Sequence, residues 1–301
     1  MPDSLALFRC FIRVAEAGSF SAVAAELRTS QPTISRQVQA LEAHLGTRLF
    51  HRTTRALSLT EDGRLFLGEA RRALDTVAEA EAAVGRRRAE PSGTLRLGVA
   101  EVLGRLHLLP RMGRFLDAHP RVGLDLVLSD GFSDMVAEGL DLAVRVGALT
   151  DPGLVARRIG TTRRVVVATP GYLAAHGWPE TPQALRAHRC IAYARLAAGP
   201  AWMLHGPDGQ VEVPLGAALR VNSTEAVRAA VLEGLGIGMV PHWHFADGEL
   251  ASGRVVRLLE GWEPPPQPIH AVFPTRRFLP ARVRAMVEFL AAEFAAEPLL
   301  N

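Results

Sequence analysis

The segment from residue 61 to about residue 85 reads as one helix that cannot bury its own apolar side chains. A capping hydroxyl, Thr60, precedes two acids of the first turn, Glu61 and Asp62. Such a helix is about 36 Å long at 1.5 Å per residue, and its stripe needs a second surface. We expect that surface to be another copy of the chain; the alternative is the chain's own later domain. The apolar residues recur at spacings of 4, 3, 4, 3 and 4, the heptad pattern of paired helices, and are Phe66, Ala70, Ala73, Val77, Ala80 and Val84.

The residues before this helix predict three short helices and a hairpin. Gly46 is a natural end for the third helix. Hydroxyls that can cap the second and third helices stand at Ser19 or Ser21 and at Ser30. Residues 47–60 contain two short extended runs around a turn rich in Arg and Thr, which is typical of a small hairpin.

The third helix, residues 31–45, concentrates hydrogen-bonding side chains in its first two turns. Gln31 and Gln37 can pair with adenine, and Arg36 with guanine. Thr33 and Ser35 can reach a base edge or a phosphate. Two short helices joined by a tight turn, the second with a polar start, predict a helix-turn-helix that enters the major groove of DNA. The other face is an apolar stripe of Ile34, Val38, Leu41 and Leu45.

Arginines in the hairpin support the same interpretation. Arg52 and Arg55 would contact the DNA backbone or the minor groove as a wing. Between residues 31 and 60 there are four arginines and one acid, whereas the whole chain has a net charge of only +3. The alternative, a solvated face of an ordinary helical subdomain, explains polar residues but not their clustering. We also include in the DNA-binding set Ser21, Ser30 and Pro32.

Beyond a charged linker at residues 85–93, strand patterns alternate with helix patterns up to the C-terminus. This alternation predicts an α/β architecture with largely parallel sheets, so the whole chain is a multidomain α+β and α/β protein. The prediction includes a helix over 103–120, a short helix over 133–139 and a strand over 211–221.

Patterns that indicate catalysis are incomplete. The glycines of residues 234–240 lie between a helix and a strand, whereas a dinucleotide fingerprint needs a strand, glycines and then a helix. His242 and His244, with His270, have no acid or cysteine to complete a metal site. No G-x-S-x-G motif occurs. We therefore expect no metal, no cofactor and no enzymatic activity.

The compartment follows from cysteine usage and hydropathy. Cys10 and Cys190 are far apart in sequence, which favours a reducing compartment over a disulfide framework. The N-terminal segment is a poor signal peptide, and no apolar run approaches the roughly 20 residues of a membrane span. We expect a cytoplasmic protein that has no membrane partner.

Residues from about 5 to 63 resemble the winged helix-turn-helix of LysR-type transcriptional regulators. The matching stretch is "FIRVAEAGSFSAVAAELRTSQPTISRQVQALEAHLGTRLFHRTTRALSLTEDG". The resemblance continues over the whole chain through "DLAVRVG", "VVVATPGYLAAHG", "GLGIGMVP" and "RVRAMVEFL". It implies a winged helix-turn-helix over 1–60, a linker and dimerisation helix with a hinge over 61–92, and an effector-binding domain over 93–301. That last domain is similar to type II periplasmic binding proteins.

The resemblance implies two lobes, one from about 93–162 plus 268–301 and the other from about 163–267. A small-molecule effector would lie in the cleft at the strand ends, where the helix beginning near Thr224 offers an anion site. Glu101 stands in a turn where relatives carry Ser or Thr, which argues against a simple carboxylate ligand unless Glu101 points to solvent. The expected effector residues are Ala100, Glu101, Val102, Leu103, Ser129, Asp130, Val146, Gly147, Asn222, Ser223 and Thr224.

The partners that the resemblance implies are double-stranded DNA with an inverted-repeat operator, a small-molecule effector, a second copy of the chain, and RNA polymerase. It also implies a tetramer as the working assembly. Two alternatives stay open. The protein would be a small-molecule-binding protein or an enzyme whose N-terminal helices serve only assembly, or a regulator that needs no ligand because Leu103 and Trp243 fill its cleft.

Overall fold

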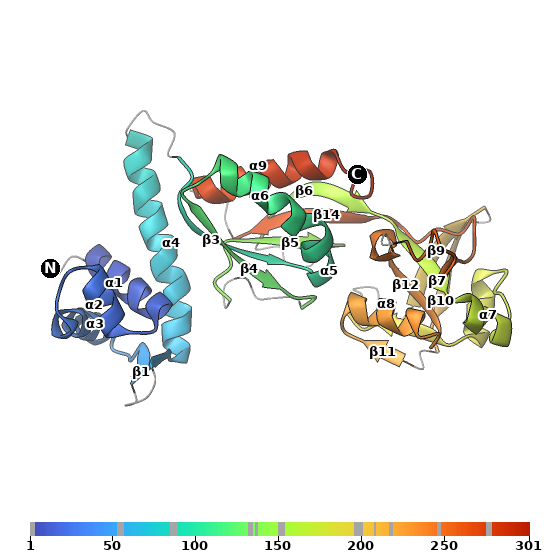
Figure 1. Cartoon of the computed structure of the whole chain (residues 1–301), viewed down its shortest axis with the longest axis horizontal. Coiled ribbons are helices and arrows are strands. Elements are labelled where there is room, and N and C mark those ends of the chain that lie inside the picture. The colour runs from blue at the N-terminus through green and yellow to red at the C-terminus, as the bar shows by residue number, and fades with distance from the viewer. Residues whose placement is uncertain are drawn as a thin grey trace.

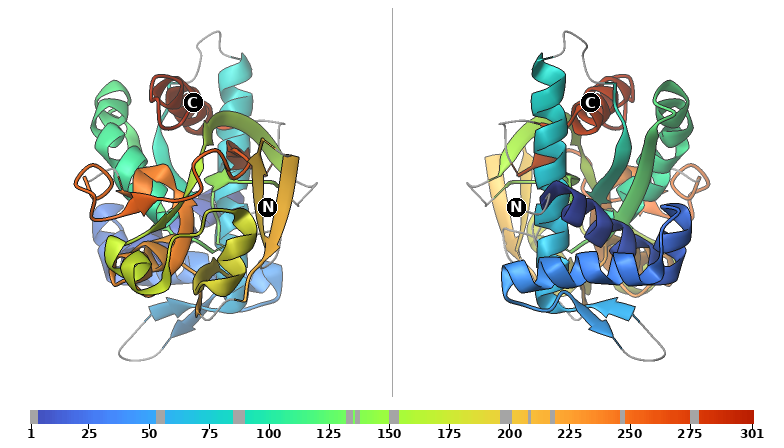
Figure 2. Two further views of the ribbon diagram at one scale, coloured as in Figure 1. Left: turned by 90° about the vertical axis from the view of Figure 1, so that its right-hand side faces the viewer. Right: turned by 90° about the vertical axis from the view of Figure 1, so that its left-hand side faces the viewer.

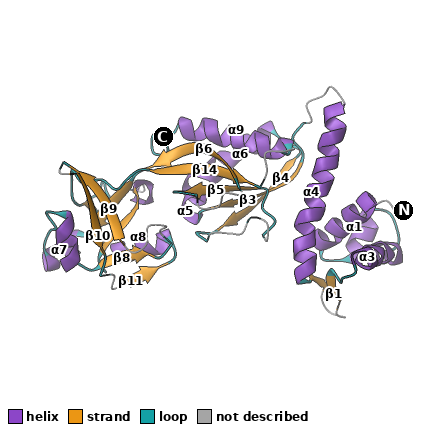
Figure 3. Cartoon of the chain, turned by 180° about the vertical axis from the view of Figure 1, so that it is seen from behind, coloured by secondary structure: helices purple, strands orange, loops and turns teal. Residues whose placement is uncertain are grey.

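The computed structural model describes residues 4–52, 57–84, 90–131, 135, 138–149, 154–195, 201–207, 209–216, 219–245, 248–274 and 279–301. It contains an N-terminal helical domain, a long helix α4, and two α/β lobes (Figure 1). Seen from the front and from behind, α4 stands between the N-terminal domain and the first lobe (Figures 1 and 3). This multidomain α+β and α/β order is the one that the sequence predicts.

The N-terminal domain packs three helices and a hairpin around one core, as predicted. Ser19 caps the second helix, because its Oγ accepts a hydrogen bond from the Ala22 N–H at 3.3 Å. Gly46 ends the third helix in the left-handed conformation, with φ +71°. Buried Ile34 and Val38 form the core with residues of the first helix. The elements are α1 (Ser4–Ala17), α2 (Phe20–Glu26), α3 (Gln31–Leu45), β1 (Phe50–Arg52) and β2 (Leu57–Leu59).

Helix α4 (Glu61–Val84) starts where the hairpin ends. Thr60 Oγ1 accepts a hydrogen bond from the Gly63 N–H at 2.9 Å, which confirms the predicted cap. A Cβ at Gly63 would lie 2.1 Å from the backbone oxygen of Leu49, so only glycine fits this junction. The Phe66 ring lies 5.3 Å from Phe8. Helix α4 is therefore fixed to the N-terminal domain.

These contacts divide the predicted dimerisation stripe. Phe66 packs on the N-terminal core and Ala70 belongs to it, so both contact the chain's own earlier domain. Ala73 and Val77 are half-buried. The side chains of the remaining two predicted residues lie outside the described residues; these are Ala80 and Val84.

The first lobe is a five-stranded sheet of order β4-β3-β5-β14-β6. Strands β3, β4 and β5 are parallel, and β14 runs antiparallel to both β5 and β6. Strand β6 leads the chain out to the second lobe, and β14 brings it back. The elements are β3 (Gly93–Val99), α5 (Glu101–Leu103), the π-helical turn η1 (Gly104–Leu108), α6 (Leu109–Ala118), β4 (Val122–Leu128), β5 (Leu142–Val146), β6 (Val155–Thr162), β14 (Gln267–Phe273) and α9 (Ala281–Ala295).

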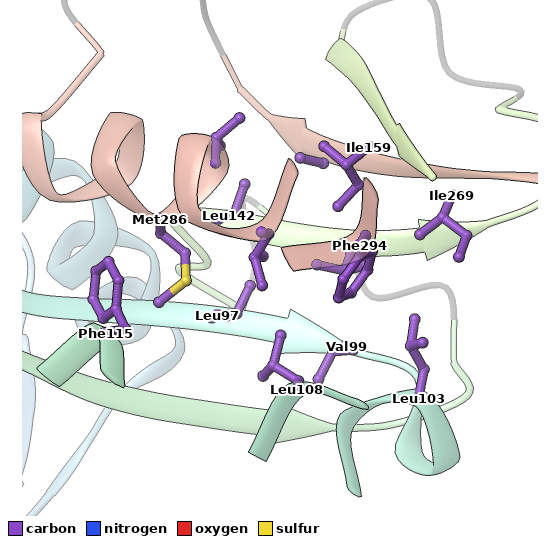
Figure 4. Packing of buried hydrophobic residues seen from close by; sticks show 14 of the residues in the cluster. Leu97, Val99, Leu103, Leu108, Phe115, Leu142, Ile159, Ile269, Met286 and Phe294 are labelled. Atoms are coloured by element: carbon purple, nitrogen blue, oxygen red, sulfur yellow. The ribbon is translucent and has the colours of Figure 1, made fainter. Parts of the chain in front are cut away.

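Helices α6 and α9 share one face of this sheet. Their buried side chains, among them Phe115 and Phe294, meet those of the strands in a single core (Figure 4). Arg111 of α6 bonds Glu297 beyond α9 at 2.7 Å. Trp243 also belongs to this core, although its neighbours in sequence are part of the second lobe. The two lobes are therefore joined by a buried aromatic side chain as well as by strands.

The second lobe has a sheet of order β11-β8-β12-β7-β13 and a separate β9-β10 hairpin. Helix α8 covers one face of the sheet, and α7 and the hairpin cover the other. The elements are β7 (Arg164–Ala168), α7 (Pro170–His176), the 3₁₀-helix η2 (Pro182–Ala187), β8 (Cys190–Tyr193), β9 (Ala201–Gly206), β10 (Gly209–Pro214), β11 (Leu219–Val221), α8 (Thr224–Leu232), β12 (Ile237–Pro241), the 3₁₀-helix η3 (His242–Phe245) and β13 (Val256–Arg257).

Several sequence predictions need correction. The sheets are mixed rather than largely parallel, because the strands that carry the chain between the lobes pair antiparallel. The helix predicted over 103–120 is interrupted by a π-helical turn at 104–108. The strand predicted over 211–221 is two strands in different sheets. Most of the short helix predicted over 133–139 lies outside the described residues. In the described part of the chain, no helix is long and apolar enough to cross a membrane.

Candidate DNA-binding face and effector cleft

The polar start of α3 lies on the surface of the N-terminal domain. Gln31, Pro32 and Arg36 are exposed, because the opposite face of α3 carries the buried stripe. In Figure 2 the β1–β2 hairpin lies next to α3, at the same end of the molecule. The remaining predicted side chains of this helix are half-buried; they are Thr33, Ser35 and Gln37.

The α2–α3 turn places hydroxyls beside this face. Ser30 is the first flanking residue of α3, as predicted, but its side chain makes no cap hydrogen bond to the backbone. Its Oγ instead lies 2.7 Å from Thr33 Oγ1. Ser21 is exposed in the first turn of α2 and is not its cap, because Ser19 takes that role.

A carboxylate fixes the hairpin to α3. Glu42 Oε1 accepts hydrogen bonds from the Leu49 N–H at 2.8 Å and the Phe50 N–H at 3.2 Å. Charge-assisted hydrogen bonds of this kind hold geometry well. The hairpin therefore keeps a set position beside α3. The Arg52 side chain and the whole of Arg55 lie outside the described residues.

A cavity of about 150 Å³ lies between the two lobes, at the ends of their strands. Open α/β sheets bind ligands at this edge. Glu101 is exposed and does not line the cavity, and neither do Asn222 and Ser223. Ser223 caps α8 instead, since its Oγ accepts the Ala226 N–H at 3.4 Å. The predicted residues that line the cavity are Ala100, Val102, Leu103, Ser129, Asp130, Val146, Gly147 and Thr224.

Asp130 connects the lobes across this cleft. Its Oδ2 accepts hydrogen bonds from Thr224 N at 2.7 Å and Thr224 Oγ1 at 2.9 Å, and its Oδ1 accepts one from Glu101 N at 3.2 Å. The N-terminus of α8, which the sequence indicated as an anion site, is therefore occupied by a carboxylate of the same chain.

The sequence reasoning missed the cationic and aromatic lining. Burial alone lowers the pKa of Arg164 to about 10. Burial, with the Asp130 carboxylate as a second cause, raises the pKa of Tyr193 to about 12, so its hydroxyl stays a neutral donor. No sequence signal distinguishes the lining arginines, Arg145, Arg164 and Arg195, from the chain's many surface arginines. Trp243, which the sequence named as a residue that fills the cleft, does line the cavity. The polar lining residues that were missed are Arg145, Arg164, Tyr193, Arg195, His244 and Gln267.

Two buried histidines lie beside the cleft. The His107 ring is 5.1 Å from the Trp243 ring, and His244 is 3% exposed. Burial and the nearby Arg111 lower the pKa of His107 to about 4. Burial and the nearby Arg228 lower the pKa of His244 to about 3. Both rings are neutral at neutral pH. In the described part of the chain they belong to no cluster of three metal-ligating side chains.

These pKa values predict a loss of stability in acid. Unfolded histidine binds a proton near pH 6.5, whereas these folded histidines do so only near pH 4 and 3, so the unfolded state binds more protons between those values. The stabilising contribution is complete above about pH 6.5 and is lost as the pH falls. Urea unfolding at about pH 7 and about pH 5 should differ by about 1–2 kcal/mol for each histidine.

The variant His107→Leu should remove the part of this pH dependence that His107 contributes and keep the part that His244 contributes. The matched control, His51→Gln, changes an exposed histidine of the N-terminal domain and should leave the dependence intact. An identical pH dependence in His107→Leu and in the unmodified protein would contradict the prediction.

Comparison with known proteins identifies both parts of the chain. The family model described as "Bacterial regulatory helix-turn-helix protein, lysR family" matches residues 5–64. The model described as "LysR substrate binding domain" matches residues 88–295. The chain is 38% identical over 290 residues to the HTH-type transcriptional regulator PtxR of Pseudomonas aeruginosa, covering 96% of this chain and 92% of that protein.

Solved structures agree with this match. The structure of CrgA, a LysR-type transcriptional regulator from Neisseria meningitidis, is 32% identical, with a TM-score of 0.59 over 95% of this chain and 97% of that one. The full-length virulence activator AphB of Vibrio cholerae is 28% identical, with a TM-score of 0.58 over 96% and 98% of the two chains. Both family models match, and the similarity to PtxR covers 96% of this chain. The chain therefore belongs to the LysR family of transcriptional regulators.

Proposed function

We propose that this LysR-type regulator reads its DNA site with the first two turns of α3 and responds to a small molecule held between its lobes. The observation that carries the first part is the exposure of Gln31 and Arg36 on α3. The opposite face of this helix buries Ile34, Val38 and Leu41, whereas Leu45, the last residue of the predicted stripe, is exposed. The arginine can donate two hydrogen bonds to the O6 and N7 acceptors of guanine, and the glutamine amide can pair with the N7 acceptor and the N6 donor of adenine in the major groove. The DNA-binding set remains Ser21, Ser30, Gln31, Pro32, Thr33, Ser35, Arg36, Gln37, Arg52 and Arg55.

The assembly that we propose is a dimer that binds an inverted-repeat operator, with α4 at the contact between copies through Ala73, Val77, Ala80 and Val84. A tetramer is the proposed working form, and RNA polymerase a proposed partner. We further propose a cytoplasmic and regulatory, non-catalytic role, which the names of the relatives support. The ligand can act only by binding two arrangements of the lobes with different affinity.

A mobility-shift titration tests the DNA function. The full chain is titrated with the DNA upstream of its own gene and with an unrelated duplex of equal length, at several stated salt concentrations. Specific recognition predicts at least about 1,000-fold tighter binding to the upstream DNA at physiological salt. Equal affinity for both duplexes would contradict sequence-specific regulation and favour the alternative in which the helices serve only assembly.

The hairpin arginines should contribute to affinity without specificity. We expect Arg52→Ala and Arg55→Ala to weaken binding to both duplexes by similar factors, because phosphate contacts carry no sequence information. Each should reduce the slope of log affinity against log salt by about 1 for every phosphate that the arginine neutralises. The measurement is the same titration at several salt concentrations, and a selective loss on the upstream DNA would refute a backbone role.

A further inference from the structure

The side chains that line the cavity between the lobes carry more positive than negative charge. Three arginines line it, Arg145, Arg164 and Arg195, and Asp130 is the acidic residue among the lining residues in the described part of the chain. Both oxygens of Asp130 already accept hydrogen bonds, from Thr224 and from the Glu101 N–H. The chain's own carboxylate is therefore used in joining the lobes.

Among these three arginines, Arg164 gives the strongest indication of the charge of the ligand that the cavity binds. It starts β7, directly after the chain crosses from the first lobe, and its Nε is fully buried without an acceptor. The side chain makes no hydrogen bond or ion pair to any residue that the structure describes. The residue as a whole is half-buried, and proteins normally pair a charge that is largely withdrawn from water. Burial also lowers the pKa of Arg164 to about 10, which leaves the guanidinium charged at neutral pH.

Arg195 brings a second cation to the same cavity from the end of β8. Its Nη1 lies 3.1 Å from the place where a Cβ on Gly131 would be, so the guanidinium of this second-lobe residue reaches the first lobe. Within the described ranges it likewise has no hydrogen-bond acceptor or acidic partner. The neutral hydroxyl of Tyr193 lines the cavity beside it.

Apolar side chains form much of the remaining lining, and the cavity is small. A cavity of about 150 Å³ is comparable to an engineered protein cavity that holds one benzene molecule. A ligand that fits it has a compact apolar body and one charged group. The apolar side chains in question are Val99, Val102, Leu103, Met239 and Trp243.

We propose that the cleft binds a small organic carboxylate with an apolar body no larger than about one aromatic ring, and that Arg164, with Arg195, receives the carboxylate. This inference rests on the proposed function of the cleft as the effector site. The sequence argument against a carboxylate depended on Glu101, and that side chain is exposed and outside the cavity lining. Arginine is suited to the role because its planar fork donates two parallel hydrogen bonds to a carboxylate.

Thermal unfolding of the full chain tests the ligand class. The probes are acetate, pyruvate, succinate and benzoate, each compared with its neutral amide at the same concentration and ionic strength. We expect at least one carboxylate to raise the Tm in a saturable way, as ligands of the folded state do, and its amide to have no comparable effect. Equal shifts with an acid and its amide, or no shift with any of the four acids, would overturn the proposal.

Variants of Arg164 test whether this residue binds the carboxylate. Arg164→Gln should weaken binding of the active carboxylate about 10- to 100-fold, the loss typical of hydrogen bonds to a charged group. Arg164→Lys should retain part of the affinity and the preference for the acid. The matched control is Arg163→Gln, an adjacent exposed arginine that pairs with Glu263 and should bind the carboxylate normally. Undiminished binding by Arg164→Gln, with circular dichroism showing a folded protein, would overturn the assignment.

Repeating the mobility shift with each probe separates this inference from the proposed function. A neutral amide that both raises the Tm and changes the DNA complex would leave effector regulation standing and overturn the anionic class. A carboxylate that binds through Arg164 without altering the DNA complex would establish the anion site and overturn effector regulation through it.

Discussion

Replacing Arg36 by Ala is expected to weaken binding to the upstream DNA by about 2–6 kcal/mol in a dimer. A bidentate arginine–guanine contact contributes about 1–3 kcal/mol, and a dimer makes it twice. Arg36 is exposed in the second turn of α3 and makes no hydrogen bond to another described residue, so its removal should leave the fold intact. The measurement is a mobility-shift titration of the upstream DNA and of the same fragment with single guanines replaced.

The matched control for this variant is Arg284→Ala. It removes the same charge from an exposed position on α9, in the first lobe. Its affinity for DNA should equal that of the unmodified protein. If Arg36→Ala keeps both the affinity and the base preference of the unmodified protein, α3 does not read the bases in the way we propose.

Replacing Trp243 by Ala is expected to lower the free energy of unfolding by about 3–5 kcal/mol, the cost of truncating a large buried aromatic side chain. Trp243 is 2% exposed and belongs to the core of the first lobe, although it follows β12 of the second. Its loss should enlarge the cavity between the lobes and loosen their relative arrangement. Urea unfolding followed by far-ultraviolet circular dichroism measures the effect without depending on tryptophan fluorescence.

A second tryptophan provides the control. Trp178 is 59% exposed, so Trp178→Ala should change the free energy of unfolding by no more than about 0.5 kcal/mol. Similar losses in the two variants would mean that Trp243 does not hold the lobes together. The same result would also weaken the view that the cleft is shaped by side chains shared between the lobes.

The N-terminal domain can be predicted in detail because its signals are local. Caps and helix ends act over three or four residues, which is why Gly46 and Thr60 can be identified from the sequence and the cap of α2 narrowed to Ser19 or Ser21. The burial of Ile34 and Val38 follows from helical periodicity.

The dimerisation stripe shows where such reasoning stops. Periodicity identifies Phe66 and Ala70 as residues that need a packing partner, and both do pack. It cannot distinguish a partner in the same chain from one in a second copy, because either surface buries the same apolar area. The aromatic contacts of Phe66 with α1 show that this part of α4 has a packing partner within the chain.

The resemblance to the family predicted where the cleft lies, whereas the charged side chains that line it became apparent only from the fold. The sequence offered Thr224 as the start of a helix that would receive an anion, and Asp130 as a separate lining residue. Their hydrogen bond joins positions 94 residues apart, so it exists only when the two lobes meet. The same is true of the position of Arg164, which lines the cavity together with residues of the first lobe such as Ser129.

By itself the sequence determined the order of the parts, the helix-turn-helix with its polar helix start, and the long helix with its apolar stripe, because these depend on neighbours within about two turns. Tertiary structure decided the strand directions, the placement of Trp243 in the other lobe's core, and the cationic lining of the cleft. The physical reason is that burial and charge pairing are properties of surfaces brought together from distant parts of the chain, and no short stretch of residues contains them.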